Sequence, residues 1–559
     1  MSKSRYLALA ILATGTAAQA QTIPPTLPTA GNQLQQLPQP PVTEKSAPEL
    51  DFDRGTPAAD AVESGVTIHV SALDVTGETA FAKADLLAAT GFVPGSDMTL
   101  TQLRALAARI SDYYHDRGFF LAHAYLPAQD VADGVVTIAV VEGRYGEITL
   151  RNEADISDAV LTRRLRGLDA QGLIVNAPLE RRLLLLSDIP GVRIKGTLAP
   201  GTAVGSSDLI VTVTPGPRIT GNLEADNGGG RYTGTYRFGG SINLDNPLGI
   251  GDRLTLRALA SDGGLAYGRV AYQAPVGNAT LGVAYAHLRY TLGREFEALD
   301  GSGTADIFSL TGSYPLIRSR RANLTALASA DYKLLHDDIG VVSSFSDKRI
   351  KAATLSLAGD ARDTLGGGGW TIFALGWTTG ELDIRSAAER AVDAITARSA
   401  GGYNKLLASV SREQSVAGPL SLLASVRGQY AFDNLDSSEK MQLGGAYGVR
   451  AYPEGEAFGD SGYIATAEAH LQLGGDPARL PGRFELTGFV ETGAVRYAQD
   501  PWFTGPNKAH RSGYGVGLNW AGPQRLLIRT SYARKLGTGP ATSAPDRSGR
   551  FWIQVVKSF

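Results

Sequence analysis

Cysteine is absent from the 559-residue sequence. This absence excludes a disulfide framework, a thiolate nucleophile and a thiolate-ligated metal, so the folded protein is held together without covalent cross-links. Long apolar runs are absent too, because no segment approaches the roughly 18 uninterrupted apolar residues that a transmembrane helix needs. A formal net charge of −2 gives no reason to expect nucleic acid as a partner. If the protein enters a membrane, it therefore does so with β-strands.

Glycine is abundant, with 67 residues, and the mean hydropathy is −0.07. A soluble protein with one apolar core and a helical membrane protein would both differ from this combination. It is typical of a β-barrel that has a wet lumen and tight turns.

The N-terminus has the pattern of a secretory signal peptide. Lys3 and Arg5 precede an apolar stretch over residues 6–13, and Ala18-Gln19-Ala20 has the small-x-small form of a signal-peptidase site. Residues 1–20 are therefore predicted to be removed on export.

Residues 21–64 are rich in Pro, Gln, Thr and Ala. Such a composition cannot bury enough apolar surface to offset the entropy of ordering, so we interpret this segment as a linker. Its prolines leave little room for more than a short helix. The sequence leaves open whether the segment plugs a barrel lumen at rest.

Residues 65–216 change to a compact α/β pattern that occurs twice. We expect two small domains, over residues 65–143 and 144–216, each with the order β-α-α-β-β at a spacing of roughly 75 residues. The best-signalled helix spans residues 99–117: Thr99 can cap it, and an apolar stripe recurs at three and four residues. The ten predicted elements are strand 66–73, helix 80–89, helix 99–117, strand 122–127 and strand 134–142, then strand 146–151, helix 158–166, helix 179–187, strand 192–198 and strand 208–215.

Residues 217–559 lose the helical period and alternate between apolar and small or polar residues in segments of about ten. In residues 512–520, for example, Tyr514, Val516 and Leu518 share one face, while glycines and Asn519 share the other. Roughly sixteen such strands can be placed, joined alternately by tight turns and longer loops. This asymmetry predicts a closed outer-membrane barrel with its short turns in the periplasm.

No catalytic or metal-binding constellation emerges. Residues 366–369 are four glycines without the Lys-Ser/Thr of a phosphate-binding loop, and they lie between strands, so we interpret them as a turn. The sequence has no Gly-x-Ser-x-Gly motif in a strand-to-helix context. The histidines show no ligand spacing: His69, His115, His123, His287, His336, His470 and His510.

Several segments together resemble a known family. The double α/β repeat resembles two POTRA domains, and residues 551–559, which end in Phe559, are similar to the terminal strand of the associated barrels. Residues 246–252 (Asn-Pro-Leu-Gly-Ile-Gly-Asp) resemble a periplasmic turn of that superfamily. The most specific match is Val449-Arg450-Ala451-Tyr452, which resembles its Val-Arg-Gly-Tyr loop tip with Ala451 in place of glycine. Two POTRA domains point to the two-partner secretion transporters, the TpsB family.

The resemblance implies a mainly β fold: a 16-stranded transmembrane antiparallel β-barrel over residues 217–559, preceded by two small α/β POTRA domains. It also implies a location in the outer membrane, surrounded by lipid, with the POTRA domains in the periplasm. The expected partner is a large exoprotein of the adhesin or haemolysin type, recognised through its N-terminal secretion domain. No cofactor, metal or enzymatic activity is expected, and the barrel-assembly machinery would insert the barrel itself.

In the family the loop-tip arginine meets an acidic residue in a Phe-x-Asp-x-Gly setting. Here the matching residues are Phe489, Glu491 and Gly493, with glutamate in place of aspartate. The alternation of this strand also places these three in the lumen. Arg450 and Glu491 are therefore the predicted pair, against the alternative of a solvent-exposed loop arginine and an unrelated lumenal charge.

The predicted function is secretion of an unfolded exoprotein through the barrel. A barrel-assembly or insertion factor is the alternative, and it would act at a lateral seam between the first and last strands. A porin or an outer-membrane enzyme is a third interpretation, but it leaves the two periplasmic repeats unexplained.

Overall fold

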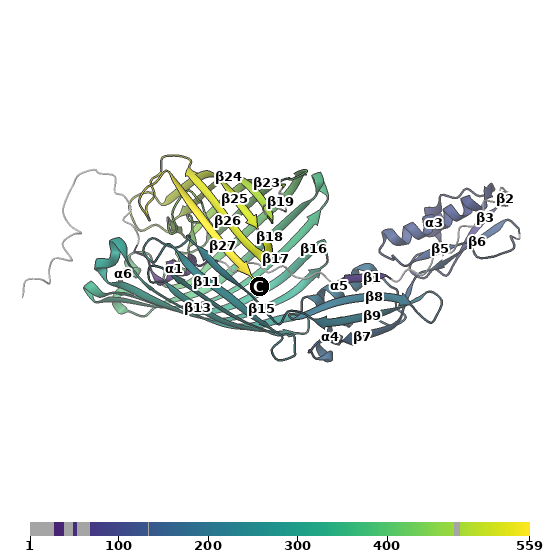
Figure 1. Ribbon diagram of the computed structural model, residues 1–559, viewed down its shortest axis with the longest axis horizontal. Helices are drawn as coiled ribbons and strands as arrows, with labels where there is room; N and C mark the ends of the chain where they lie inside the picture. The colour runs from purple at the N-terminus through teal and green to yellow at the C-terminus, as the bar shows by residue number, and fades with distance from the viewer. Residues whose placement is uncertain (1–26, 39–48, 53–66, 132, 475–480) are drawn as a thin grey trace, which may run out of the picture.

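A computed structural model describes residues 27–38, 49–52, 67–131, 133–474 and 481–559. The predicted signal peptide and much of the predicted linker lie outside the described residues. No helix in the described part of the chain is both long and apolar enough to cross a bilayer. The chain forms a β-barrel at one end and two small α/β domains, one after the other along the long axis, at the other end (Figure 1).

The first α/β domain has a three-stranded sheet of order β3-β6-β5 and a separate β2-β4 pair. The second has a four-stranded sheet of order β1-β8-β9-β7, in which β1 spans Glu49–Phe52. Their elements are β2 (Thr67–Val70), β3 (Ala72–Thr76), α2 (Lys83–Thr90), β4 (Ser96–Thr99), α3 (Leu100–Asp116), β5 (His123–Tyr125) and β6 (Val135–Val141), then β7 (Arg144–Asn152), α4 (Asp158–Leu165), α5 (Asn176–Ser187), β8 (Val192–Pro200) and β9 (Ser206–Pro215).

Helix α3 confirms the prediction for residues 99–117. Thr99 caps it in a reciprocal arrangement with Gln102, and Leu103, Leu106 and Ile110 are buried against the sheet. Together with the second domain's own apolar cluster, this gives each domain a separate core.

Several predictions in these domains are wrong: helix α2 begins at Lys83 rather than at Ala80, and strand β4 was not predicted. The single strand predicted over residues 66–73 is split at Ser71, because β2 pairs with β4 whereas β3 pairs with β6. Helix α5 begins at Asn176 rather than at Leu179, because Pro178 is tolerated in the first helical turn, where its missing N–H has no intrahelical partner.

Sixteen antiparallel strands close into the barrel, with β10 next to β27, which confirms the predicted strand number and closure. The strands are β10 (Ile219–Asp226), β11 (Arg237–Asp245), β12 (Arg253–Ser261), β13 (Ala266–Val276), β14 (Ala279–Thr291), β15 (Gly301–Arg318), β16 (Ala322–Ile339), β17 (Ser344–Asp363), β18 (Gly369–Ile384), β19 (Gly401–Ala417), β20 (Leu420–Ala431), β23 (Ser461–Leu473), β24 (Arg483–Arg496), β25 (Lys508–Ala521), β26 (Leu526–Lys535) and β27 (Gly549–Ser558).

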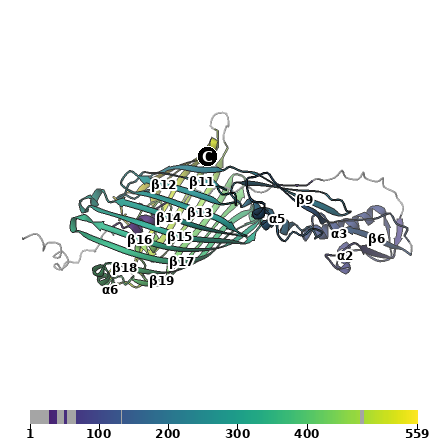
Figure 2. The ribbon, with the colours of Figure 1, turned by 90° about the horizontal axis from the view of Figure 1, so that it is seen from below.

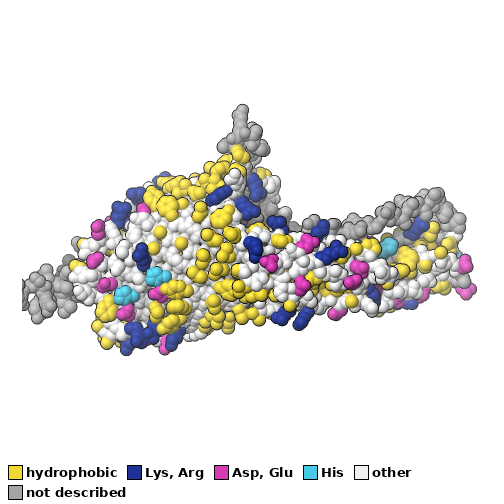
Figure 3. Space-filling model, turned by 60° about the horizontal axis from the view of Figure 1, so that its bottom comes forward, with side chains coloured by type: hydrophobic (Ala, Val, Ile, Leu, Met, Phe, Trp, Pro, Cys, Tyr) yellow, Lys and Arg dark blue, Asp and Glu magenta, His cyan; other side chains and the backbone are white. Residues whose placement is uncertain are grey.

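The predicted outward faces are exposed on the barrel surface. Tyr514, Val516 and Leu518 of β25 are 44%, 59% and 42% exposed, as expected for side chains that contact lipid. On the face of the barrel that Figure 3 shows, apolar side chains gather in a band on the side of the α/β domains, while acidic and histidine side chains lie toward the far end. This band marks the part of the barrel that the membrane surrounds.

The barrel wall is uneven in height. Strands β15, β16 and β17 have 18, 18 and 20 residues, whereas β10 and β11 have eight and nine. The far rim carries the long connections, one of which contains a helix that periodicity did not predict, α6 (Ala387–Ile395). The longest connection, residues 432–460, contains the short hairpin β21 (Met441–Gln442) and β22 (Phe458–Gly459).

Two parts of the predicted linker segment are ordered on the rest of the chain. Helix α1 (Ala30–Gln35) lies inside the barrel against β14, β15 and β16 (Figures 1 and 2). Strand β1 (Glu49–Phe52) adds in parallel to the edge of β8. The composition of this segment left room for a short helix, but no pattern in it predicted the strand.

The second α/β domain is docked on the periplasmic turns of the barrel. Arg318 makes a bidentate ion pair with Asp188, with hydrogen bonds of 2.8 and 3.0 Å. Arg181 donates to the carbonyl oxygens of Pro315 and Leu316. These bonds join α5 and its C-terminal end to the β15–β16 turn.

Candidate functional site

The predicted loop tip is folded into the barrel lumen. Val449, Ala451 and Tyr452 are at most 1% exposed and belong to an apolar cluster with residues of the barrel wall. The Val449 N–H donates to the Leu443 carbonyl and the Tyr452 N–H to the Val449 carbonyl, which closes a tight turn around Arg450. The tip is therefore a packed element and not a free loop.

The structure brings Arg450 and Glu491 together. The Arg450 Nε donates to Glu491 Oε1 at 2.6 Å, and the Arg450 main-chain N–H donates to Oε2 at 2.8 Å. The guanidinium lies 3.5 Å from the centre of the Phe489 ring, which adds a cation–π contact. Because the Glu491 side chain is only 3% exposed, this carboxylate depends on Arg450 for its charge compensation.

The glycines of the wall make room for the tip. A Cβ at Gly493 would lie 2.7 Å from Leu443 Cδ1, and a Cβ at Gly513 would lie 2.5 Å from the Cβ of Ala451. The methyl group of Ala451, which replaces the glycine of the family motif, is thus accommodated by Gly513 on the neighbouring strand β25.

Tyr452 extends the contact toward the C-terminal strands. Its hydroxyl donates to the Gly539 carbonyl at 3.1 Å, and its ring lies near the cationic ends of Arg511 and Lys535. On the other side of the turn, Trp552 Nε1 donates to the Arg450 carbonyl at 2.7 Å. The tip is therefore anchored on β24, β25 and β27 together.

Sequence reasoning missed two members of this site. Glu468 of β23 forms a second ion pair with Arg450 and also contacts His470 Nε2 at 2.9 Å. The alternation of residues 461–473 did place Glu468 in the lumen, so a signal existed, but the register of β23 on β24, which sets Glu468 opposite Phe489, was needed to use it. No pattern in the sequence indicated that Trp552 contacts the loop tip.

The base of the same loop is charged and buried. Glu439 accepts from Lys333 and Lys405 at 2.6 and 2.9 Å, and Asp436 pairs with Lys348 at 3.1 Å. These lysines come from β16, β17 and β19, on the tall side of the wall. The loop is thus fixed at its base to one side of the barrel and at its tip to the other.

Helix α1 contacts this loop base directly. Thr29 Oγ1 is 2.9 Å from Ser437 Oγ, the Ala30 N–H donates to Asp337 Oδ1 at 2.7 Å, and the Thr233 hydroxyl donates to Gln33 at 2.8 Å. Gly31 packs so closely that a Cβ there would lie 2.6 Å from the Ser438 main-chain nitrogen. Helix and loop fill the lumen as one packed unit.

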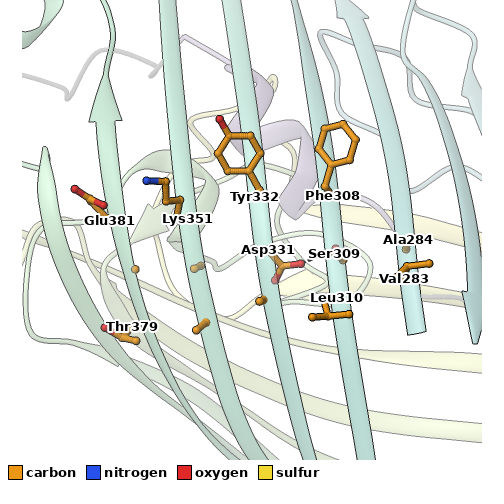
Figure 4. A pocket seen from close by; sticks show the side chains of 14 residues that line it. Val283, Ala284, Phe308, Ser309, Leu310, Asp331, Tyr332, Lys351, Thr379 and Glu381 are labelled. Atoms are coloured by element: carbon orange, nitrogen blue, oxygen red, sulfur yellow. Dashed lines mark hydrogen bonds between the residues drawn. The ribbon is translucent and has the colours of Figure 1, made fainter. Parts of the chain in front are cut away.

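Two hollows in the barrel differ in character. A polar one of about 330 Å³ lies beneath the loop tip, bordered by Arg450, Glu468 and Glu485. A larger one of about 790 Å³ crosses β14–β18 and is mainly apolar, with Phe308, Tyr332 and other outward side chains standing over it (Figure 4). The exposed apolar residues at this face suit contact with lipid, and the charged side chains of Lys351 and Glu381 also line the hollow.

Within the described ranges no three His, Asp or Glu side chains are grouped in a way that could hold a metal ion. The site consists of ion pairs, main-chain hydrogen bonds and packed apolar groups. Such an arrangement can hold or release a loop.

The closed barrel, its lumenal loop and the α/β domains on its periplasmic side define the class: an outer-membrane β-barrel transporter with periplasmic POTRA domains. Residues 205–520, more than half of the chain, match the family model described as "Haemolysin secretion/activation protein ShlB/FhaC/HecB", and residues 68–143 match "POTRA domain, ShlB-type". The chain therefore belongs to the ShlB/FhaC/HecB family of secretion proteins.

Relatives of this chain are transporters. The chain is 27% identical over 472 residues to "Heme/hemopexin transporter protein HuxB" of Haemophilus influenzae, which covers 83% of this chain and 82% of that protein. It is 25% identical over 388 residues to "Outer membrane transporter CdiB" of Dickeya dadantii, covering 67% of each. The solved structure of CdiB from Escherichia coli matches with a TM-score of 0.69 at 21% identity, over 90% of this chain and 93% of that one.

Proposed function

We propose that this protein secretes a large exoprotein partner, received unfolded from the periplasm, through the lumen of its barrel. The family membership supports secretion. One observation carries the route: helix α1 and the residues after it, up to Pro38, lie within the barrel and bond to its inner wall. A lumen that holds a segment of its own polypeptide has the dimensions and the polar lining to admit another.

In this proposal α1 is a resting plug. It is short, and short helices are marginal in water without tertiary contacts, so its stability comes from bonds such as those to Asp337 and Ser437. A client that replaces these bonds displaces the helix. Because the bonds are few and polar, exchange is compatible with repeated opening.

Capture of the client is proposed to occur by strand addition in the periplasm. The edge of β8 accepts β1 as a parallel strand over four residue pairs, which supports the ability of this domain to bind an extended segment. In strand addition, main-chain hydrogen bonds give affinity and side-chain pockets give selectivity. Two of the relatives are named a heme/hemopexin transporter and an outer-membrane transporter, which supports a role in moving a client across the outer membrane.

The free energy for transport is proposed to come from folding of the client outside the cell. Folding on the far side removes the unfolded chain from the equilibrium and makes backsliding unfavourable, by the same mass action that links binding to stability. In this scheme the protein itself performs no chemistry on the client.

An assembly or insertion factor remains the second candidate, because the barrel seam is short. Strand β10 pairs with β27 over Asn222–Asp226, with further main-chain bonds from Gly221 to Phe559 and from Asn227 to Ile553 at the two ends of the seam. It pairs with β11 over all eight of its residues. A factor of this kind would open that seam to client strands. Cross-linking the seam would stop such a factor but leave a lumenal transporter active.

The test uses a candidate partner, a large secreted protein whose gene neighbours the gene of this protein, and measures its secretion in cells that produce the intact protein, Arg450→Ala or Arg289→Ala. Arg289, on the outward face of β14, is the matched control. Secretion that requires the intact protein, survives Arg289→Ala and fails with a folded Arg450→Ala barrel supports the proposal. Secretion that never depends on the protein contradicts it.

A further inference from the structure

Two arginines on the inner wall hold the chain that follows α1 by its main chain. Arg237 of β11 donates to the Gln36 carbonyl oxygen at 2.7 Å, and Arg257 of β12 donates to the Pro38 carbonyl oxygen at 2.9 Å. Neither bond uses a side chain of the held segment. Binding by these two arginines is therefore independent of the side chains of the bound segment.

A carboxylate of β10 orients each guanidinium. Arg237 Nε donates to Asp226 Oδ1 at 2.8 Å, and Arg257 donates to Glu224 Oε1 at 2.8 Å. The four side chains are at most 9% exposed. Each arginine is thus fixed in place with donors left over for a carbonyl, which is the condition for binding without further ordering.

The second oxygen of each carboxylate is buried and has no hydrogen-bond partner among the described residues: these are Glu224 Oε2 and Asp226 Oδ2. A buried acceptor without a donor is costly. A main-chain N–H is such a donor. Each pair therefore presents a donor for C=O beside an acceptor for N–H, the two hydrogen-bonding groups of the main chain.

The two held carbonyls belong to the chain where it leaves α1. Gln36 is the C-terminal cap of the helix and keeps helical dihedral angles (φ −89°, ψ −5°), and its carbonyl and that of Pro38 both accept from the wall. The wall therefore binds main-chain oxygens of a segment that is not in a strand conformation.

We infer that the pairs Asp226–Arg237 and Glu224–Arg257 form a main-chain binding track for the polypeptide in transit, which residues 36–38 occupy at rest. The inference rests on the proposed function. Recognition of the backbone lets one short track contact every part of a long client in turn, and displacement of residues 36–38 makes the track available as the plug leaves.

The test uses the full-length chain with Gly31→Leu, because a larger side chain at this close contact prevents α1 from seating. The pore is placed in a planar bilayer, and an uncharged peptide of about 20 Gly, Ser and Asn residues, flexible and extended in solution, is added on the periplasmic side. The measured quantity is the dwell time of each current blockade. Heat-modifiable mobility checks that every variant has a folded barrel.

Arg257→Gln is expected to shorten the dwell time about fivefold, the effect of losing one hydrogen bond from a charged donor. The double variant Asp226→Asn/Arg237→Gln, which leaves no unpaired buried charge, should also shorten the dwell time. Arg269→Gln is the matched control, because Arg269 lies opposite Arg257 on β13 and no bond from it to residues 27–38 is found in the described structure. A poly(ethylene glycol) chain of similar length has no amide groups, so its dwell time should not change.

Equal peptide dwell times in all folded variants would overturn the track while leaving the lumenal route intact. If Arg269→Gln shortened the dwell time as much as Arg257→Gln, the track would also be overturned, because a general loss of positive charge would then explain the effect. If the peptide never enters the Gly31→Leu pore, the inference and the proposed function fail together.

Discussion

At the scale of single residues, the two carboxylates around Arg450 are not equivalent. Glu491 accepts from both the side chain and the main chain of Arg450, whereas Glu468 shares its oxygens between Arg450 and His470. Glu491 therefore fixes the position of the loop tip, and Glu468 mainly balances its charge.

Glu491→Gln is accordingly expected to weaken the loop more than Glu468→Gln. Leaving a buried charge without its partner costs about 3–5 kcal/mol at most, and water in the lumen reduces this. The measurement is the rate of proteolysis within residues 432–460 in folded barrels. A faster cut in Glu468→Gln than in Glu491→Gln would contradict the assignment.

A second residue-scale prediction concerns Ala451 and Gly513. Gly513→Ala should prevent the tip from seating, because the new Cβ would lie 2.5 Å from that of Ala451, and contacts so short force one element to shift. Adding Ala451→Gly should restore most of the wild-type protease resistance. If the double variant stays as sensitive as Gly513→Ala alone, the contact is not the cause.

At the scale of the elements, the first POTRA domain depends on one buried carboxylate near the end of β6. Glu142 accepts from the main-chain N–H groups of Thr79 and Ala80 at 2.6 and 2.7 Å and from the Tyr114 hydroxyl at 2.8 Å. Burial alone would raise the pKa of Glu142, but these hydrogen bonds outweigh it and hold the pKa below its ordinary value. The charged form is thus favoured by folding.

The lowered pKa of Glu142 determines how the stability of this domain changes with pH. A carboxyl with a lowered folded-state pKa stabilises the domain above its unfolded pKa, about 4.3 for glutamate, and this stability is lost as the pH falls through the folded value. The urea midpoint of the POTRA helices, followed by circular dichroism at the helix band, should therefore change little from pH 7 to about pH 5 and drop as the pH is lowered further, to about pH 3. At pH 7 the free energy of unfolding of Glu142→Gln should be about 2 kcal/mol lower than that of the wild type, and its urea midpoint should change less with pH. Glu147→Gln, at an exposed position of β7, should behave like the wild type.

How far the sequence predicted these elements depended on the kind of signal. Alternation over residues 483–496 was enough to place Glu491 and Phe489 in the lumen, and the capped stripe of α3 was enough for that helix. Strand β1 and the contact of Trp552 with Arg450 depend on residues more than a hundred positions apart. Local periodicity carries no information on such pairings, so they could not be predicted.

At the scale of the whole molecule, the ion pair between Asp188 and Arg318 helps to fix the second POTRA domain relative to the barrel. Its two hydrogen bonds give it a defined geometry, unlike a single surface contact. In the proposed function, this domain presents a captured client to the barrel at a set angle.

Arg318→Asp should broaden the distribution of distances between the two parts, and adding Asp188→Arg should narrow it again. The distances can be measured by electron paramagnetic resonance between spin labels at Ala170→Cys and Ala417→Cys, since the chain has no other cysteine to label. An unchanged distribution in Arg318→Asp would show that the remaining contacts suffice to hold the joint.

The composition of the segment that lies in the lumen has an electrical consequence. Residues 27–38 contain no Asp, Glu, Lys or Arg. A membrane potential does work of about 2.3 kcal/mol per elementary charge per 100 mV, so a field acting across the barrel exerts almost no net pull on this segment. Opening of the pore should therefore follow the supply of client and not the applied voltage, which suits a membrane that is not itself energised.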